Sequence, residues 1–358
     1  MNAVGEANAK VYFLSFVDRN YSRSSVLLNF NSQNLYKEFI SFKYETRQIV
    51  KQLFSLKKVL DKSSIIVIMS PSHKITVLAR MILGCPIILD AGWPLTDGVM
   101  SRGLKPRTIG NLITSFLIDF ISFHSSSHIL VESNPQLSRI RKYYFVSLKK
   151  MTVSFTGLNE TAFVPQMHQG RIAQTLSLQL RERSFQLVVL FRGKINKESG
   201  IDVIVGAAKT LINEMAFVIL TGAETGLKEL PSNCFIISNV TESEMAQIYE
   251  ISDIALGQLS NHPRLSYTIP HKAFEAGYFS KCYVTADSRG VQELYSEENS
   301  VYVPIVNAEN LVLALKNLQS REIREKYGAS INKRYRSVSS QQILNQNFEN
   351  LIAKLHSK

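Results

Sequence analysis

The stretch TIPHKAFEAG, residues 268–277, places a proline, a histidine, a lysine and a glutamate close together. Pro270 favours the first turn of a helix, because the N–H that proline lacks would have no partner there. A helix that begins here presents His271 and Lys272 together with free backbone N–H groups, which attract an anion. Glu275 follows one turn later and can accept hydrogen bonds from hydroxyl groups. The stretch therefore predicts a ligand that carries both phosphate and hydroxyl groups.

This expected helix lies in a half of the chain in which apolar strands alternate with helices. The strands are expected at 185–193, 215–222, 234–238, 253–258 and 282–286. The helices are expected at 200–214 and 241–252, and a last polar-apolar helix at 339–358. Near-continuous Val, Ile and Leu strands separated by helices favour a parallel, doubly wound sheet.

The first half of the chain repeats this alternation. Strands are expected at 10–16, 63–70, 85–90, 128–133 and 151–157, and helices at 34–60, 73–83, 107–124 and 135–145. The apolar run at 109–123 is too short to span a bilayer and is expected to be a buried amphipathic helix. We therefore expect an α/β protein with two domains, residues 1–165 and 166–338, and a helix at 339–358 that packs back on the first.

Charge is distributed unevenly along the 358 residues. Residues 1–165 carry a formal net charge of +10, whereas residues 166–358 carry +2. A basic first half can meet nucleic acid, anionic lipid or a phosphorylated acceptor, or be only a solvated basic surface. The N-terminus has no signal-peptide pattern, and three distant cysteines favour a reduced, cytoplasmic protein.

The second half resembles the family-4 glycosyltransferases, which have two Rossmann-like domains facing across a cleft (the B-type glycosyltransferase fold). The resemblance is closest over 185–300 and rests on three stretches. The first is FRGKINKESG, in which the family clamps the donor diphosphate with basic residues beside glycines. It implies diphosphate contacts from Arg192, Gly193, Lys194 and Lys197. Where the family has lysine before the second glycine, this chain has Ser199.

The second stretch, NVTESEMAQIYEISDIALGQL, resembles the passage in which the family holds the nucleobase. It implies base contacts from Thr221, Gly222, Asn239 and Val240. The third is the stretch that opens this section, where family members carry two glutamates. Glu275 matches the glutamate that grips the donor ribose, whereas Tyr267 takes the place of the other. The resemblance also implies donor contacts from Ile269, Pro270, His271 and Lys272.

The resemblance implies transfer of a sugar from a nucleotide-sugar donor, with retained stereochemistry. Fixed cations and helix-start N–H groups can stabilise the leaving diphosphate, so neither a metal nor another cofactor is expected. The sequence has no Asp-x-Asp motif at a strand end and no metal-ligand spacing of His and Cys. Asp90, at the end of an expected strand, is the candidate base for the acceptor hydroxyl, and Asp97 and His73 are the alternatives.

Two basic clusters in the first half suit an acceptor at an anionic membrane surface. They are Lys51, Lys57, Lys58 and Lys62, and Arg139, Arg141, Lys142, Lys149 and Lys150 beside Tyr143, Tyr144 and Phe145. The acceptor is expected to be lipid-linked or a polysaccharide, at the cytoplasmic membrane face. No zinc spacing or aromatic RNA-binding signature indicates nucleic acid as a partner. A nucleotide-sugar 2-epimerase and a non-catalytic, transferase-like subunit stay open as alternatives.

Overall fold

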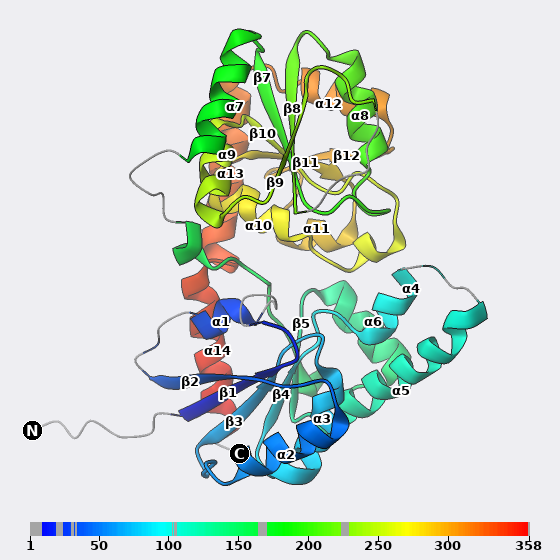
Figure 1. Ribbon diagram of the computed structural model, residues 1–358, viewed down its shortest axis with the longest axis vertical. Coiled ribbons are helices and arrows are strands. Elements are labelled where there is room, and N and C mark those ends of the chain that lie inside the picture. Colours follow the sequence, from blue (N-terminus) through cyan, green and yellow to red (C-terminus); the bar gives the residue numbers. More distant parts are fainter. Residues whose placement is uncertain are drawn as a thin grey trace, which may run out of the picture. The chain divides into compact units, whose positions relative to one another are not determined.

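The chain divides into two compact units, which Figure 1 shows as ribbons in a computed structural model. One unit comprises residues 1–157 with 341–358, and the other comprises residues 158–340. The structure describes residues 9–18, 24–29, 32, 34–101, 103, 106–163, 170–222 and 229–356. The expected domain boundary at residue 165 lies outside these described residues.

The first unit is built on a six-stranded sheet in which every pairing is parallel. In spatial order the strands are β2 (Leu35–Ser41), β1 (Ala9–Ser15), β3 (Ser64–Ile68), β4 (Ile87–Asp90), β5 (His128–Val131) and β6 (Met151–Val153). The helices are α1 (Ser25–Asn29), α2 (Thr46–Lys57), α3 (His73–Leu83), α4 (Leu95–Ser101), α5 (Ile109–Ser125), α6 (Asn134–Tyr144) and α14 (Gln341–His356). Parallel strands need such crossover connections.

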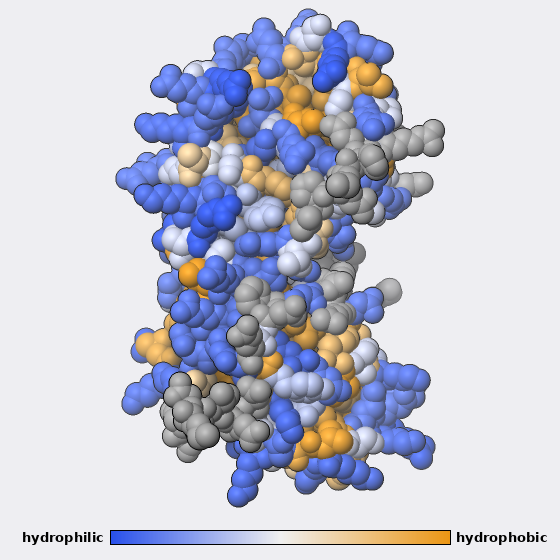
Figure 2. All heavy atoms as spheres, turned by 90° about the vertical axis from the view of Figure 1, so that its left-hand side faces the viewer, coloured by the Kyte–Doolittle hydropathy of each residue, from blue (hydrophilic) through white to orange (hydrophobic). Residues whose placement is uncertain are grey.

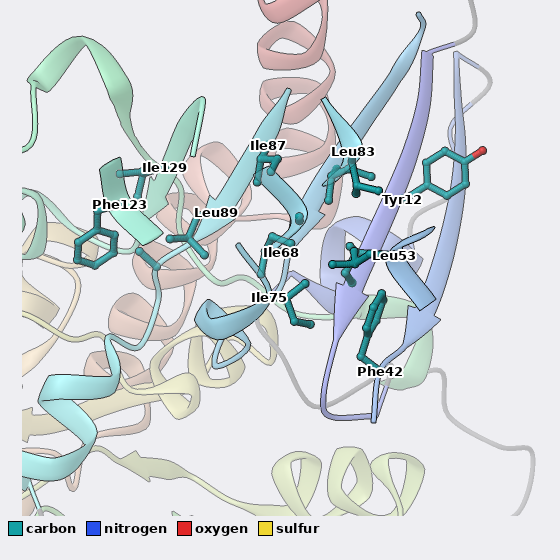
Figure 3. Packing of buried hydrophobic residues seen from close by; sticks show 14 of the residues in the cluster. Tyr12, Phe42, Leu53, Ile68, Ile75, Leu83, Ile87, Leu89, Phe123 and Ile129 are labelled. Atoms are coloured by element: carbon teal, nitrogen blue, oxygen red, sulfur yellow. The ribbon is translucent and has the colours of Figure 1, made fainter. Parts of the chain in front are cut away.

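Successive side chains of β1 point to opposite faces of this sheet and contribute to a hydrophobic core on each face. Tyr12 and Leu14 pack with residues of α2, α3 and α5, among them Leu53, Ile75 and Phe123 (Figure 3). Val11 and Phe13 point to the opposite face and pack against α1 and α14. From α14 come Leu344, Phe348, Leu351 and Ile352. Helix α14 therefore completes a core of the first unit.

The second unit has its own six-stranded parallel sheet. In spatial order the strands are β9 (Cys234–Ser238), β8 (Met215–Thr221), β7 (Leu187–Arg192), β10 (Ile254–Leu256), β11 (Cys282–Ala286) and β12 (Val301–Val303). The helices are α7 (Arg171–Glu182), α8 (Ile201–Thr210), α9 (Glu242–Ile251), α10 (His271–Tyr278), α11 (Arg289–Leu294), α12 (Ala308–Lys316) and α13 (Arg321–Val338). Strand order reverses between β7 and β10, and ligands of such sheets bind at the carboxyl side of that switch point.

Helices cover both faces of the second sheet (Figure 1). Helices α8 and α12 pack on one face, where Ile204 and Leu311 join Val189 of β7 in one apolar core. Figure 1 places α7, α9 and α13 on the other face. Hydrophilic residues predominate on the molecular surface in Figure 2, as expected for outward helix faces. The prediction of doubly wound, parallel α/β sheets in both halves is confirmed.

The helix expected over residues 34–60 is wrong in its first part. Residues 35–41 form β2, an edge strand that pairs only with β1 among the described strands. Its sequence LYKEFIS alternates in burial, as a strand with one face on the core does. The helix that follows, α2, begins only at Thr46. No strand was expected at β12, a three-residue element too short to give a clear pattern.

The apolar run at 109–123 forms the expected helix, α5, but the prediction that it is buried is wrong. Its buried residues are Asp119, Ser122 and Phe123, whereas large apolar side chains at Ile109, Ile113, Leu117 and Ile121 are exposed. Hydrophobicity alone does not reveal which side of a helix faces the domain when apolar residues are spread around its circumference. Among the described residues, no helix is long and apolar enough to cross a membrane.

Candidate functional site

Strand register brings the predicted donor residues to one edge of the second sheet. Arg192 of β7 is paired with Leu220 of β8, and the Gly193 N–H donates to the Leu220 carbonyl oxygen at 2.9 Å. Thr221, the next residue of β8, is paired with Ser238 at the end of β9. Because these strands are parallel, their carboxyl ends meet beside the switch point. Candidates from separate motifs are thus neighbours.

Glu275 of α10 is the best-connected carboxylate of this edge. Its side chain is 0% exposed, and its Oε1 lies 3.1 Å from Nη1 of Arg192 and 3.0 Å from Nδ1 of His271. Tyr249 of α9 donates from its hydroxyl to Oε2 at 2.8 Å. A buried charge is tolerated only when it is paired and hydrogen-bonded, and this one has three partners from three elements. Strand β7 and helices α9 and α10 are therefore tied together at the site.

The charge state of Glu275 follows from these contacts. Burial by itself would raise the pKa of this carboxyl, but the Arg192 charge and the hydrogen bonds from His271 and Tyr249 outweigh it. The pKa is lowered from 4.5 to about 2. Glu275 is therefore a carboxylate at neutral pH, and its negative charge holds Arg192 at the end of β7. In this state its two oxygens are directed at protein partners.

Lys272 is the second basic residue of the edge, and unlike Arg192 it is buried. Its ammonium group lies 3.6 Å from the ring centroid of Phe191 and 3.3 Å from Oε1 of Gln258, which follows β10. Burial lowers the pKa of Lys272 well below its ordinary value, although the charge of Glu275 opposes this effect. An anion placed here would favour the charged form of Lys272 and gain a desolvated cation as its partner.

Gly193 makes room for this lysine. Its φ of +143° belongs to the region that L side chains rarely adopt, and a Cβ there would lie 3.2 Å from Nζ of Lys272. The glycine therefore lets the main chain after β7 pass close to the ammonium group. The main chain at Gly193 and the ammonium group of Lys272 are therefore neighbours, and a diphosphate site combines such backbone and cationic groups.

The other basic residues of the loop after β7 are placed differently. Lys194 and Lys197 are exposed, outside the network that holds Arg192 and Lys272. The loop itself is pinned at Glu198, which accepts two hydrogen bonds of 2.9 Å from Nη1 of Arg264. It ends at Gly200, where a Cβ would lie 1.7 Å from the carbonyl oxygen of Leu259.

The four residues predicted to hold a nucleobase follow β8 and β9. Thr221 is buried and Gly222 is exposed, each at the carboxyl end of β8. Asn239 has a φ of +56°, a conformation that asparagine tolerates better than most residues, and Val240 follows it. A capping box between Thr241 and Glu244 then begins α9. The turn before α9 is thus locally fixed.

The remaining donor candidates begin α10 as the sequence predicts. Ile269 is buried, and Pro270 is the N-cap residue of the helix with a φ of −61°. His271 is half exposed while its Nδ1 contacts Glu275. The side-chain partners Tyr249, Phe191 and Gln258 were not predicted, because helix packing, which spacing does not reveal, brings them to the site. Gln258 had one signal, its place at the end of an expected strand.

In the first unit, Asp90 lies at the carboxyl end of β4 and is fully buried. Its Oδ2 accepts a hydrogen bond of 2.5 Å from the Ser24 hydroxyl, and its Oδ1 accepts one of 3.1 Å from the Gly92 N–H. These bonds fix the turn after the strand. Its predicted role as a base stays a prediction.

The two alternatives to Asp90 are also engaged within the domain. Asp97 is buried and lies 2.9 Å from Nη2 of Arg139. His73 begins α3 with a side chain that is 0% exposed, and its Nδ1 lies 2.7 Å from Oδ1 of Asp119. Its Nε2 is buried without a hydrogen-bond partner in the part of the chain that the structure describes. Within that part, no cluster of three or more His, Cys, Asp or Glu side chains could hold a metal ion.

Comparisons with known proteins find likeness in structure and not in sequence. No protein-family model matches the chain, and no curated protein matches it. Among solved structures, it is similar to a glycosyltransferase from Rickettsia africae (12% identity, 98% of this chain and 99% of that one, TM-score 0.69). It is also similar to Anabaena Alr3699/HepE in complex with UDP and glucose (10% identity, 97% and 100%, TM-score 0.73).

A third similar structure is the sucrose-phosphate synthase of Thermosynechococcus elongatus, with 12% identity over 98% of this chain and 100% of that one and a TM-score of 0.72. All of these matches extend over both units of the chain. The chain therefore has the two-domain B-type glycosyltransferase fold, and the resemblance that the sequence indicates is confirmed at the level of the fold.

The Glu275 network makes a prediction about stability and pH. A carboxyl whose folded pKa of about 2 lies below its ordinary 4.5 stabilises the fold above pH 4.5 and loses this effect as the pH falls toward 2. The difference in unfolding free energy between wild type and Glu275→Gln should shrink by about 3 kcal/mol over that window. Urea unfolding of both proteins at a series of pH values measures it.

Glu325→Gln is the matched control, because Glu325 is 63% exposed and pairs only with Arg321 of its own helix among the ion pairs of the described residues. Its difference from wild type should be small at every pH. A Glu275→Gln difference that stays constant from neutral pH downward would show that the carboxylate is not held in its charged form by these partners.

Proposed function

We propose that this chain is a glycosyltransferase that binds a nucleotide-sugar donor at the carboxyl edge of its second sheet. The observation that carries the proposal is the pair of cations at the switch point between β7 and β10. Arg192 is fixed there by Glu275 at 3.1 Å, and the ammonium group of Lys272 is buried beside Gly193. Support comes from HepE, a protein of the same fold that has been crystallised with UDP-glucose and with UDP.

In this proposal Lys272 and Arg192 bind the donor diphosphate. When the sugar departs, negative charge grows on the diphosphate, and cations fixed in a low-dielectric site stabilise it. They cost little reorganisation, because Gln258 and Glu275 already hold them. The exposed Lys194 and Lys197, in the loop after β7, contribute further positive charge beside the phosphates. Protein cations supply the charge, so we propose that transfer is metal-independent.

The nucleoside lies over the ends of β8 and β9, where Thr221, Gly222, Asn239 and Val240 contact the base. Glu275 is assigned to the ribose by resemblance, but its buried oxygens are already bonded to protein groups. We propose that it acts first by fixing Arg192 and His271. Contact with a ribose hydroxyl then requires His271, which is half exposed, to yield its place on Oε1.

We propose that the acceptor is lipid-linked or a polysaccharide, used in cell-surface glycan synthesis at the cytoplasmic membrane face, and that the anomeric configuration is retained. The basic first half of the chain supports an anionic acceptor surface. Asp90 is proposed as the acceptor base. This role requires one of its hydrogen bonds, to Ser24 or to Gly92, to open when the acceptor binds.

Replacing the buried lysine tests the donor site. Lys272→Met removes the charge and keeps the apolar stem over Phe191, so folding should survive while affinity for UDP falls at least about tenfold. Calorimetric titration with UDP in the presence of EDTA measures this, and binding should be retained by the wild type. Lys197→Met, which changes an exposed lysine, should weaken binding less. Equal affinity of Lys272→Met and wild type would remove Lys272 from the site.

Asp90→Asn tests the acceptor side. If Asp90 takes the acceptor proton, hydrolysis of UDP-glucose should slow about a hundredfold or more, while the dissociation constant of UDP stays within about twofold. Glu132→Gln is the matched control, because it changes another buried carboxylate of the same unit that has no proposed part in the reaction. A lowered melting temperature with unchanged hydrolysis would make Asp90 a structural residue, and donor binding without any hydrolysis by wild type would favour a non-catalytic subunit.

A further inference from the structure

Helix α5 buries two polar side chains and leaves five large apolar ones exposed. Toward the domain it presents Asp119, Ser122 and Phe123, all 0% exposed. Asp119 accepts hydrogen bonds from the N–H groups of Leu95 and Thr96 at 3.0 and 2.8 Å. Ser122 donates to the carbonyl oxygen of His73 at 2.8 Å. These hydrogen bonds fasten the helix to α3 and α4, and the apolar side chains of its other side face outward.

The outward apolar side chains form one stripe. They recur at three- and four-residue intervals, which places them on one side of a helix. The stripe consists of Ile109 (53% exposed), Ile113 (56%), Phe116 (36%), Leu117 (51%) and Ile121 (45%). Isolated exposed apolar residues are ordinary, but a contiguous row of five along one helix marks a contact surface.

The surroundings of the stripe are positively charged. Between residues 109 and 157 the sequence has five Lys or Arg and two acidic residues, Asp119 and Glu132, and both of these are buried. The basic residues are Arg139, Arg141, Lys142, Lys149 and Lys150. The part of the surface that this segment contributes therefore combines apolar side chains with charge of one sign.

Direct contacts connect the basic segment with α5. The Tyr144 ring, at the end of α6, stacks on Phe116 with 5.0 Å between centroids. The Lys150 ammonium group donates to the carbonyl oxygens of Phe123 and His124 at 3.0 and 2.7 Å. Beside Tyr144, the rings of Tyr143 and Phe145 are 48% and 79% exposed. The charges and additional aromatic groups thus adjoin the carboxyl-terminal end of the stripe.

We propose that α5 is the membrane-docking element of this protein, lying in the plane of an anionic bilayer with its apolar stripe in the interface. An interfacial helix needs an apolar face and basic residues beside it, and α5 with the end of α6 supplies both. Arg139 is paired with Asp97, whereas Arg141, Lys142 and Lys149 are exposed. A protein partner would have to match these three positive charges, whereas anionic headgroups match them without a specific geometry. This inference does not depend on the proposed catalytic function, because binding to vesicles needs neither donor nor acceptor.

Co-sedimentation of the full-length chain with vesicles tests the proposal. The probes are phosphatidylcholine vesicles with and without phosphatidylglycerol. The combined variant Ile113→Ser, Leu117→Ser, Ile121→Ser should reduce partitioning onto the anionic vesicles at least about tenfold relative to wild type. The matched control replaces three equally exposed apolar residues of the second unit, Leu178, Ile305 and Leu313, with serine and should bind like wild type.

A second variant tests the charge independently of α5. Combining Arg141→Gln, Lys142→Gln and Lys149→Gln should lower binding to anionic vesicles about tenfold or more and leave the weak binding to neutral vesicles unchanged. Equal melting temperatures and equal UDP affinity of all variants would confirm that the fold and the donor site are intact.

Three results would overturn the proposal. The first is a wild-type chain that does not partition onto anionic vesicles. The second is a serine variant that partitions as well as wild type. The third is that neither protein binds vesicles, while wild type is a dimer in sedimentation velocity and the serine variant is a monomer. The stripe would then be an interface between copies of this chain. None of these results would change the conclusion drawn from the UDP affinity of Lys272→Met, because that experiment tests the donor site separately.

Discussion

The second unit depends on one electrostatic constraint, the placement of the charged Glu275 in its interior. A carboxylate without exposure to water needs charged or hydrogen-bonding partners, and this one has Arg192 from β7, Tyr249 from α9 and His271 from its own helix. Each partner fixes the element that carries it. The end of β7, and with it Gly193, is thereby held beside Lys272. The positive groups of the proposed donor site are thus arranged in advance around a negative one.

The sequence predicts the layers of this molecule well, because strands buried on both faces are nearly continuous apolar runs and stand out between helices. It fails at β2, whose alternating residues belong to an edge strand, and at the three-residue β12. For the site, the sequence predicts which residues lie at strand ends, and the parallel pairing of the strands brings those ends to one edge of the sheet. It does not reveal that Glu275 points inward or that Lys272 lies over Phe191, because both depend on how helices pack on the sheet.

Helix α5 illustrates a second limit of sequence. An apolar helix has the same composition whether it is enclosed by a domain or lies on its surface, so hydrophobicity predicts the helix and not its environment. What decides here is the side of the helix that has partners in the domain. Asp119 and Ser122 have hydrogen-bond partners on the domain side, and Phe123 is buried in the core beside them. These three side chains therefore determine which surface the remaining apolar ones present.

Helix α14 has a consequence for the order in which the chain acquires its structure during synthesis. The unit formed by residues 158–340 is contiguous, whereas the other unit combines residues 1–157 with α14, which follows residue 340. Until α14 is synthesised, the first unit lacks Leu344, Phe348, Leu351 and Ile352, and α1 alone contributes helix residues to that face of its sheet. Val11 and Phe13 therefore stay partly unshielded until the whole of the second unit has been synthesised.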